Sequence, residues 1–155
     1  MASNRRDLIK MTHEERVAFI DSQKSLQVAT INADGTPHLT TLWFAVVEGD
    51  IVFETFTKSQ KIKNLERDPR IACLVEDGEK YEQLRGVQLN GTVELHTDPD
   101  IVHGYAAQVM KRNNPEVPAE LLDDAALAMA AKRTAVVVKA DNVVSWDHRK
   151  LGGTY

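Results

Sequence analysis

The alternation of hydrophobic and polar positions predicts a chain built mainly from β-strands. The alternation is clearest between residues 87 and 95, where it covers the length of a half-buried strand. Gly86 and Gly91 lie beside and within this stretch and predict bends or bulges there. Further stretches rich in β-branched and apolar residues are expected to form strands: residues 26–31, 37–47, 51–56, 71–75 and about 134–146.

Tight-turn signals separate the first three of these strands. Asp34-Gly35 follows the first strand, and Glu48-Gly49-Asp50 follows the second. Pro37 removes one backbone donor at the start of the second strand, which a strand end tolerates. Residues 25–57 are therefore expected to form a three-stranded antiparallel meander.

Capping signals predict four helices around these strands. Thr12 and Glu15 have the spacing of a capping box. A second helix is expected from about Ser59 to Arg67, where Asp68-Pro69 stops it. Asp98-Pro99 opens a third, with proline at the favoured first position. Pro118 opens a fourth, whose apolar face is expected to comprise Leu121, Leu122, Ala125, Ala126 and Met129.

Six strands with hairpin connections and a few helices define a mainly β fold class, an antiparallel barrel or sandwich with appended helices. A parallel α/β sheet would need strands and helices to alternate regularly, whereas here three strands come first in a row. The 155 residues are expected to form a single domain, residues 1–155.

Composition excludes several classes of function. The net charge of −4 gives no basic excess for general nucleic-acid binding. Cys73 is the single cysteine, so an internal disulfide and a cysteine-rich zinc site are excluded, and we expect an inert buried thiol. No targeting segment or apolar run of membrane-spanning length is visible, so a cytoplasmic location without a membrane partner is expected.

Local charge indicates where an anion could bind. Residues 58–70 contain five basic and two acidic residues at a predicted strand-to-helix junction. A helix N-terminus attracts anions, and Thr55, Thr57 and Ser59 add hydroxyls beside it. Lys61 shares the inward face with Leu65, so it is either an anion ligand or a lysine that reaches solvent past the helix end.

No constellation for covalent catalysis is present, and the histidines lack metal-ligand spacing, so no catalytic residue is assigned and no metal site is expected. The C-terminal segment from Ser145 onward combines Trp146, His148 and Arg149. It is either a solvated terminus or a clasp over a planar anionic ligand in a substrate pocket, including a ligand bound by a neighbouring subunit.

The order of the motifs resembles the pyridoxamine 5′-phosphate oxidase-like flavin-binding split barrels over roughly residues 12–146. The short length and the Asn-Leu-x-x-Asp-Pro-Arg segment are most similar to the actinobacterial branch that uses the deazaflavin coenzyme F-420. The motifs that carry the resemblance are Asp34-Gly35-Thr36-Pro37, Phe53-Glu54-Thr55, Ser59-Gln60-Lys61, Asn64-Leu65 with Asp68-Pro69-Arg70, and Gly86 with Gly91.

The resemblance implies a six-stranded split barrel that forms a homodimer with a cofactor in each interface groove. Ser59 and Lys61 would bind the cofactor phosphate, and Thr55 would lie beneath the ribityl chain. The ring would be lined, partly through backbone groups, by Thr40, Thr41, Leu42 and Trp43.

The implied activity is hydride transfer between F-420 and a small unsaturated compound such as an enone. An FMN-binding oxidoreductase of the same fold would also fit, although Gln60 stands where FMN oxidases of the family tend to have arginine; Lys58 could compensate. The C-terminal Arg-x-His motif of a true pyridoxamine phosphate oxidase is missing, which argues against that activity. The same fold would also serve a non-catalytic carrier of flavin, deazaflavin or haem, or an interaction module without cofactor.

Overall fold

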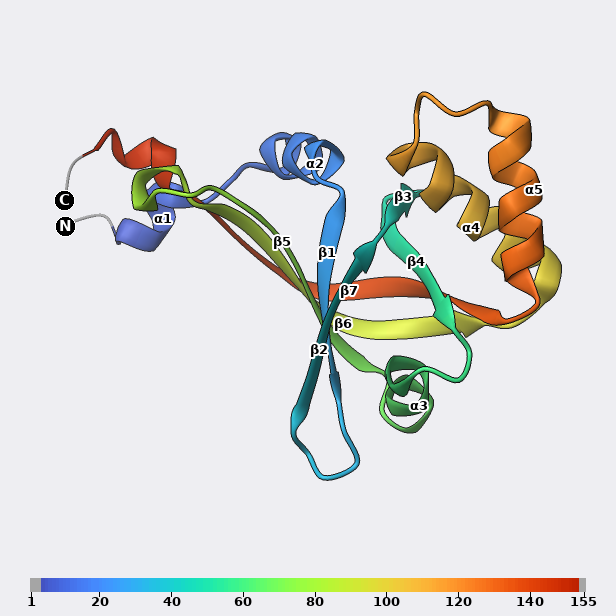
Figure 1. Cartoon of the computed structure of the whole chain (residues 1–155). Coiled ribbons are helices and arrows are strands. Elements are labelled where there is room, and N and C mark those ends of the chain that lie inside the picture. The colour runs from blue at the N-terminus through green and yellow to red at the C-terminus, as the bar shows by residue number, and fades with distance from the viewer. Residues whose placement is uncertain (1–3, 154–155) are drawn as a thin grey trace.

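The computed structural model describes residues 4–153. Its centre is one antiparallel sheet that curls into a half-barrel, with the strand order β2-β1-β5-β6-β7-β4-β3 (Figure 1). The strands are β1 Ser25–Ile31, β2 Pro37–Trp43, β3 Ala45–Val47, β4 Asp50–Phe56, β5 Arg70–Asp77, β6 Arg85–His96 and β7 Arg133–Asp147. The mainly β, antiparallel fold class predicted from the sequence is confirmed.

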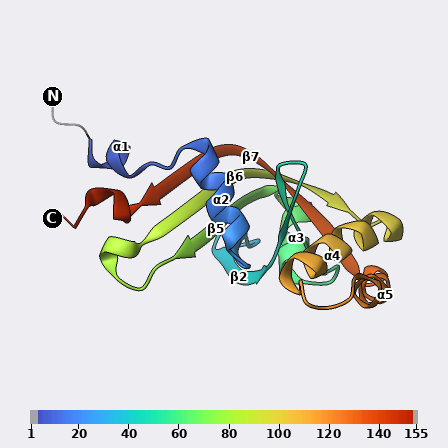
Figure 2. The same ribbon diagram turned by 90° about the horizontal axis from the view of Figure 1, so that it is seen from above.

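Five α-helices and two short 3₁₀ helices flank the sheet. In both views α4 and α5 lie at one end of the sheet, whereas α1 and η2 lie at the opposite end (Figure 1, Figure 2). The helices are α1 Arg5–Ile9, α2 His13–Ser22, α3 Gln60–Arg67, η1 Tyr81–Gln83, α4 Pro99–Asn113, α5 Ala119–Ala130 and η2 His148–Leu151. Among the described residues no helix is long and apolar enough to cross a membrane.

The strand expected over residues 37–47 changes its pairing partner at Phe44, so it counts as two strands. β2 pairs with β1, and β3 pairs with β4. The carbonyl of Phe44 accepts a hydrogen bond from Asn113 Nδ2 at 3.3 Å, and its buried ring carries the Arg112 guanidinium at 4.2 Å. Residues 37–43 thus pair with β1, whereas residues 45–47 pair with β4. The expected three-stranded meander is therefore divided at Phe44, where α4 contacts the chain.

The barrel interior is an apolar core contributed by nearly every strand. Phe53, Val28 and Val136 are fully buried in it, together with Ile62 and Leu65 from α3. Small clusters of apolar residues pack α4 and α5 against the other face of β4 and β7. α3 is therefore anchored by its own apolar face, which fixes where its N-terminus lies.

The predicted helix caps are confirmed, but one predicted helix face is partly wrong. Thr12 and Glu15 form both hydrogen bonds of a capping box, and Asp98 caps α4. In α5 the side chain of Leu121 is 61% exposed, whereas Leu122 is buried. The buried face of α5 is narrower than the predicted apolar face. It consists of Leu122, Ala126 and Ala130, which are spaced four residues apart.

Both glycines of the long central strand have a steric role. The β6–β7 register shifts between Asn90 and Gly91, which confirms the predicted bulge. A Cβ on Gly91 would overlap the Lys139 carbonyl, and one on Gly86 would overlap the indole of Trp146. Both positions therefore need glycine because another strand or side chain approaches closely.

Candidate functional site

The N-terminus of α3 lies at the junction with β4 and is the candidate anion site. Ser59 is the N-cap, and its Oγ accepts a hydrogen bond from the Ile62 N–H at 3.4 Å. The N–H groups of Gln60 and Lys61 make no hydrogen bond within the described part of the chain. They point their positive dipole ends out of the helix, as expected of a site that attracts anions.

Lys61 lies in the first turn of α3 and is partly buried. Burial lowers the pKa of its ammonium group, and no carboxylate of the described residues pairs with it. Two acidic side chains nearby in the sequence are engaged elsewhere: Glu54 pairs with Arg133 at 2.6 Å, and Asp68 pairs with Arg70 at 2.7 Å. The positive charge of Lys61 is therefore available to an external anion.

Three threonines lie where β4, β7 and α3 meet. Thr55 is buried and pairs across the strands with Thr134. The hydroxyls of Thr57 and Thr134 are 3.0 Å apart. Sequence reasoning missed Thr134; a threonine directly before a run of alanine and valine was the available signal, but the strand register was needed to place it.

Asn64 ties the anion-site helix to the barrel. It is fully buried, and its Nδ2 donates to Thr30 Oγ1 and to Asn32 Oδ1, both at 3.0 Å. Its Oδ1 accepts from Gln60 Nε2 at 2.8 Å. The sequence motif included Asn64, but its role in holding α3 against β1 is visible only in the structure.

The four residues predicted to line a cofactor ring lie on two faces of β2. Thr40 and Leu42 pair opposite the buried Val28 and Leu26, so they face the barrel interior. Thr41 and Trp43, in contrast, are exposed on the outer face. β2 is the terminal strand of the sheet, so one of its backbone edges is unpaired in the described chain. Backbone groups of all four residues lie along this strand.

The Oγ1 of Thr40 is buried without a hydrogen-bond partner in the described chain, as is the Nδ1 of His38 on the same face. Buried polar atoms are normally paired, so both atoms are available to a hydrogen-bond partner from outside the described chain. β2 therefore offers unpaired polar groups, as the first turn of α3 does.

The described part of the C-terminal segment, up to residue 153, packs against the end of the sheet, and Thr154 and Tyr155 lie outside the described residues. His148 Nδ1 contacts the Tyr81 carbonyl at 2.8 Å, and Arg149 pairs with the buried carboxylate of Asp147 at 2.6 Å. Trp146 and His148 line one cavity together, whereas Arg149 lines smaller cavities on the other side of β7. The structure thus brings together two of the three residues predicted for a clasp.

Two expectations about chemistry can be compared with side-chain geometry. Burial raises the pKa of Cys73 to about 12, which makes it the inert thiol that was predicted. Lys58 is exposed in the turn before Ser59 and could swing toward the anion site. Within residues 4–153 no group of three or more His, Cys, Asp or Glu side chains is arranged to hold a metal ion.

A curled antiparallel half-barrel with flanking helices is the architecture of the split-barrel class of proteins. The chain belongs to the pyridoxamine 5′-phosphate oxidase family, whose profile matches residues 12–147. The comparison with curated proteins gave no significant match.

Solved structures agree with this assignment. The conserved hypothetical protein Rv2991 from Mycobacterium tuberculosis is 40% identical, with a TM-score of 0.89 over 99% of this chain and 95% of that one. An F-420 reductase is 25% identical, with a TM-score of 0.63 over 81% of this chain and 93% of the reductase. The haem storage protein HutZ from Vibrio cholerae shares the fold at 16% identity, with a TM-score of 0.64 over 86% of this chain and 94% of that one.

Proposed function

We propose that this protein is a cytoplasmic coenzyme F-420-dependent oxidoreductase that acts on a small unsaturated organic substrate. The observation that carries the proposal is Lys61, a partly buried cation without a carboxylate partner in the described chain, at the open N-terminus of α3. A phosphorylated cofactor supplies the anion that such a site lacks. The likeness to an F-420 reductase across most of both chains supports this choice.

The residues present fit such a cofactor. Ser59, Lys61 and the free N–H groups of the first turn would hold its phosphate, with Lys58 near enough to add a charge. The hydroxyls of Thr55 and Thr134 lie beside this point, where a polyol chain would leave the phosphate. The unpaired Thr40 Oγ1 and the open edge of β2 would then meet the ring.

The bound deazaflavin supplies the hydride, and the protein contributes position and exclusion of water. The side chain of Lys61 fixes the phosphate end, while β2 orients the ring by backbone hydrogen bonds. The barrel interior behind Thr40 and Leu42 is apolar, so one face of the ring is shielded from solvent. Substrate would therefore approach from the outer face of β2.

We further propose that the active form is a homodimer with the cofactor in a groove between subunits. Leu39 and Trp43 are 69% and 49% exposed on the outer face of β2. Gln27 lies on the same face of the neighbouring strand, and its Oε1 is buried without a partner in the described chain. A second subunit would cover the apolar groups and close the groove over the ring.

The side chain of Gln60 favours F-420 over FMN. It donates to Asn64 inside α3, so it offers a phosphate no additional positive charge. A site with Lys61 as its inward cation suits a phosphodiester, such as that of F-420, better than the doubly charged phosphate of FMN.

A titration of both cofactors against the same apo preparation tests the proposal. We expect F-420 to bind more tightly than FMN and the Lys61→Ala variant to lose at least about tenfold in F-420 affinity. Lys63→Ala is the matched control, because Lys63 is exposed on the outer side of the same helix. Reduced F-420 should be oxidised when enones are added.

Three results would overturn the proposal. A yellow protein that binds FMN and ignores F-420 would favour an FMN-binding oxidoreductase. Tight F-420 binding without turnover on any substrate of a broad panel would favour a carrier. Unchanged affinity in Lys61→Ala would remove the anion site itself.

A further inference from the structure

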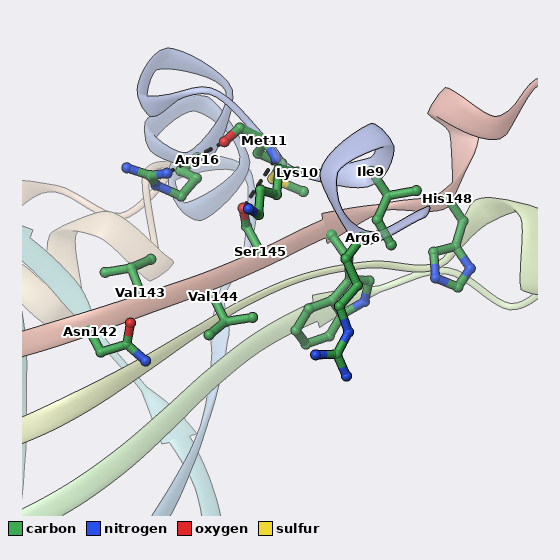
Figure 3. Close-up of a pocket in the computed structure, with 11 residues that line it drawn as sticks. Arg6, Ile9, Lys10, Met11, Arg16, Asn142, Val143, Val144, Ser145 and His148 are labelled. Atoms are coloured by element: carbon green, nitrogen blue, oxygen red, sulfur yellow. Dashed lines mark hydrogen bonds between the residues drawn. The ribbon is translucent and has the colours of Figure 1, made fainter. Parts of the chain in front are cut away.

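The largest of the described cavities lies away from the α3 anion site, between α1, the start of α2 and the C-terminal half of β7 (Figure 3). We refer to it as the α1–β7 cavity. Its volume is about 640 Å³, which is within the range of small-molecule sites. Its walls join residues 6–16 to residues 142–148, and none of residues 58–61 lines it.

Basic side chains line this cavity, and no carboxylate of the described chain does. They are Arg6, Lys10, Arg16 and His148. The guanidinium of Arg6 has no partner in the described chain, and that of Arg16 makes one long contact, 3.4 Å, to the Met11 carbonyl. Figure 3 shows Arg16 at the α2 end of the cavity and Arg6 at the α1 end.

The carboxylates near this cavity pair with cations other than Arg6 and Arg16, and one of them neutralises Lys10 of the cavity lining. Asp7 pairs with Lys10 at 2.6 Å, and Glu15 pairs with Lys150 at 2.6 Å. Asp147, the next residue along β7, faces the opposite side. The two arginines therefore keep most of their donors free of protein partners in the described chain, and guanidinium groups bind acidic groups through paired hydrogen bonds.

The floor of the cavity is apolar. Val144, which is 46% exposed, shares one face of β7 with Trp146, and Ile9 lines the cavity from α1. Val143, which is 39% exposed, lies on the opposite face, so the cavity extends around the free edge of β7. This half of β7 has β6 on one side only, because β4 pairs no further along it than Val137. An apolar floor with cationic rims suits a flat ring that carries an acidic group.

We propose that the α1–β7 cavity is a binding site for a small aromatic anion, an aryl carboxylate or sulfonate. Its ring would lie on Val144 and Trp146, and its acidic group would be held by Arg6 or Arg16. This site is separate from the cofactor site, so it does not depend on the proposed activity.

A pair of fluorescent probes tests the proposal on the apo protein. Anilinonaphthalene sulfonate carries the ring system and the charge, whereas phenylnaphthylamine carries a similar ring system without charge. We expect the sulfonate to bind one equivalent per chain and at least about tenfold more tightly than the neutral probe. In a Trp43→Phe variant Trp146 is the only remaining indole, so its quenching places the probe in the cavity.

Variants and salt separate this site from unspecific binding. The double variant Arg6→Gln with Arg16→Gln should lower the affinity for the sulfonate probe about tenfold and leave the affinity for the neutral probe unchanged. Lys111→Gln, an exposed control on α4, should change neither affinity. In the unaltered protein, added salt should weaken binding of the sulfonate probe but not of the neutral probe. This measurement tests the role of charge even if the double variant fails to fold. Equal affinity for both probes, absent quenching of Trp146, or displacement of the sulfonate by F-420 would each overturn the proposal.

Discussion

The amide of Asn64 in α3 donates a hydrogen bond to the hydroxyl of Thr30 in β1 at 3.0 Å, and both side chains are almost completely buried. This contact joins the anion-site helix to a strand 34 residues away in the sequence. Because the same amide also holds Asn32 and Gln60, the position of the first turn of α3 depends on one side chain.

Replacing Asn64 by leucine should destabilise the protein by about 2 kcal/mol, because the hydroxyl of Thr30 and the amide of Asn32 lose a buried partner. Denaturant unfolding measures this loss. Thr30→Val in the Asn64→Leu background removes one orphaned group, so the double variant should be more stable than the sum of the two single effects. Strict additivity would show that the hydrogen bond contributes nothing.

A second prediction concerns Gly86, which lies against the indole of Trp146. Gly86→Ala places a Cβ inside the ring volume, so the ring must move or the protein must lose about 1–3 kcal/mol. The measurements are thermal unfolding and the fluorescence of Trp146. Gly104→Ala is the matched control, because nothing lies within 4 Å of a Cβ at this helical position. It should stabilise the protein by up to about 1 kcal/mol.

Much of the fold could be predicted because its signals are local. Hydrophobic alternation and turn residues placed all six strand regions, and caps such as Ser59 and Asp98 placed the helix starts. The change of pairing partner at Phe44 could not be predicted, since it arises from contacts with α4 more than 60 residues away. Nor did the periodicity of α5 reveal that Leu121 faces solvent.

The candidate site was predicted in part for the same reason. Ser59 and Lys61 are two residues apart in sequence, and the start of one helix places them in the same turn. Thr134 joins them only through the β4–β7 register, and Arg6 and Trp146 line one cavity only because α1 packs along β7. Side chains that meet across distant elements leave no signal in one unaligned sequence.

Replacing Lys61 should have opposite effects on stability and on cofactor binding. Burial lowers its pKa, so the unfolded chain holds this proton more tightly than the folded chain, and stability rises as the pH goes from the lowered pKa toward 10.5. Lys61→Met removes the cost of desolvation. The apo variant should therefore be at least as resistant to urea at pH 7 as the unaltered protein, although it binds F-420 poorly. A clearly less stable variant would indicate a structural role for this lysine.

The ion pair of Glu54 and Arg133 gives the last prediction, which concerns pH. Burial raises the pKa of the Glu54 carboxyl, and Arg133, 2.6 Å away, partly opposes this increase. Arg133→Met removes the opposition, so the pKa rises further. The folded chain then holds the proton more tightly than the unfolded chain, and stability falls as the pH rises from about 4.5 through the raised pKa.

Arg133→Met should therefore cost about 2 kcal/mol at pH 8 and much less at pH 4, as measured by denaturant unfolding at both values. The cost stays below that of a fully buried pair, because the Arg133 side chain is 21% exposed. Adding Glu54→Gln to this variant removes the titrating group and should abolish the difference between the two pH values. Lys139→Met is the control, since its pair with Asp50 is more exposed. An equal loss at pH 4 and pH 8 would assign the effect of Arg133 to its packing on Phe56 and not to charge.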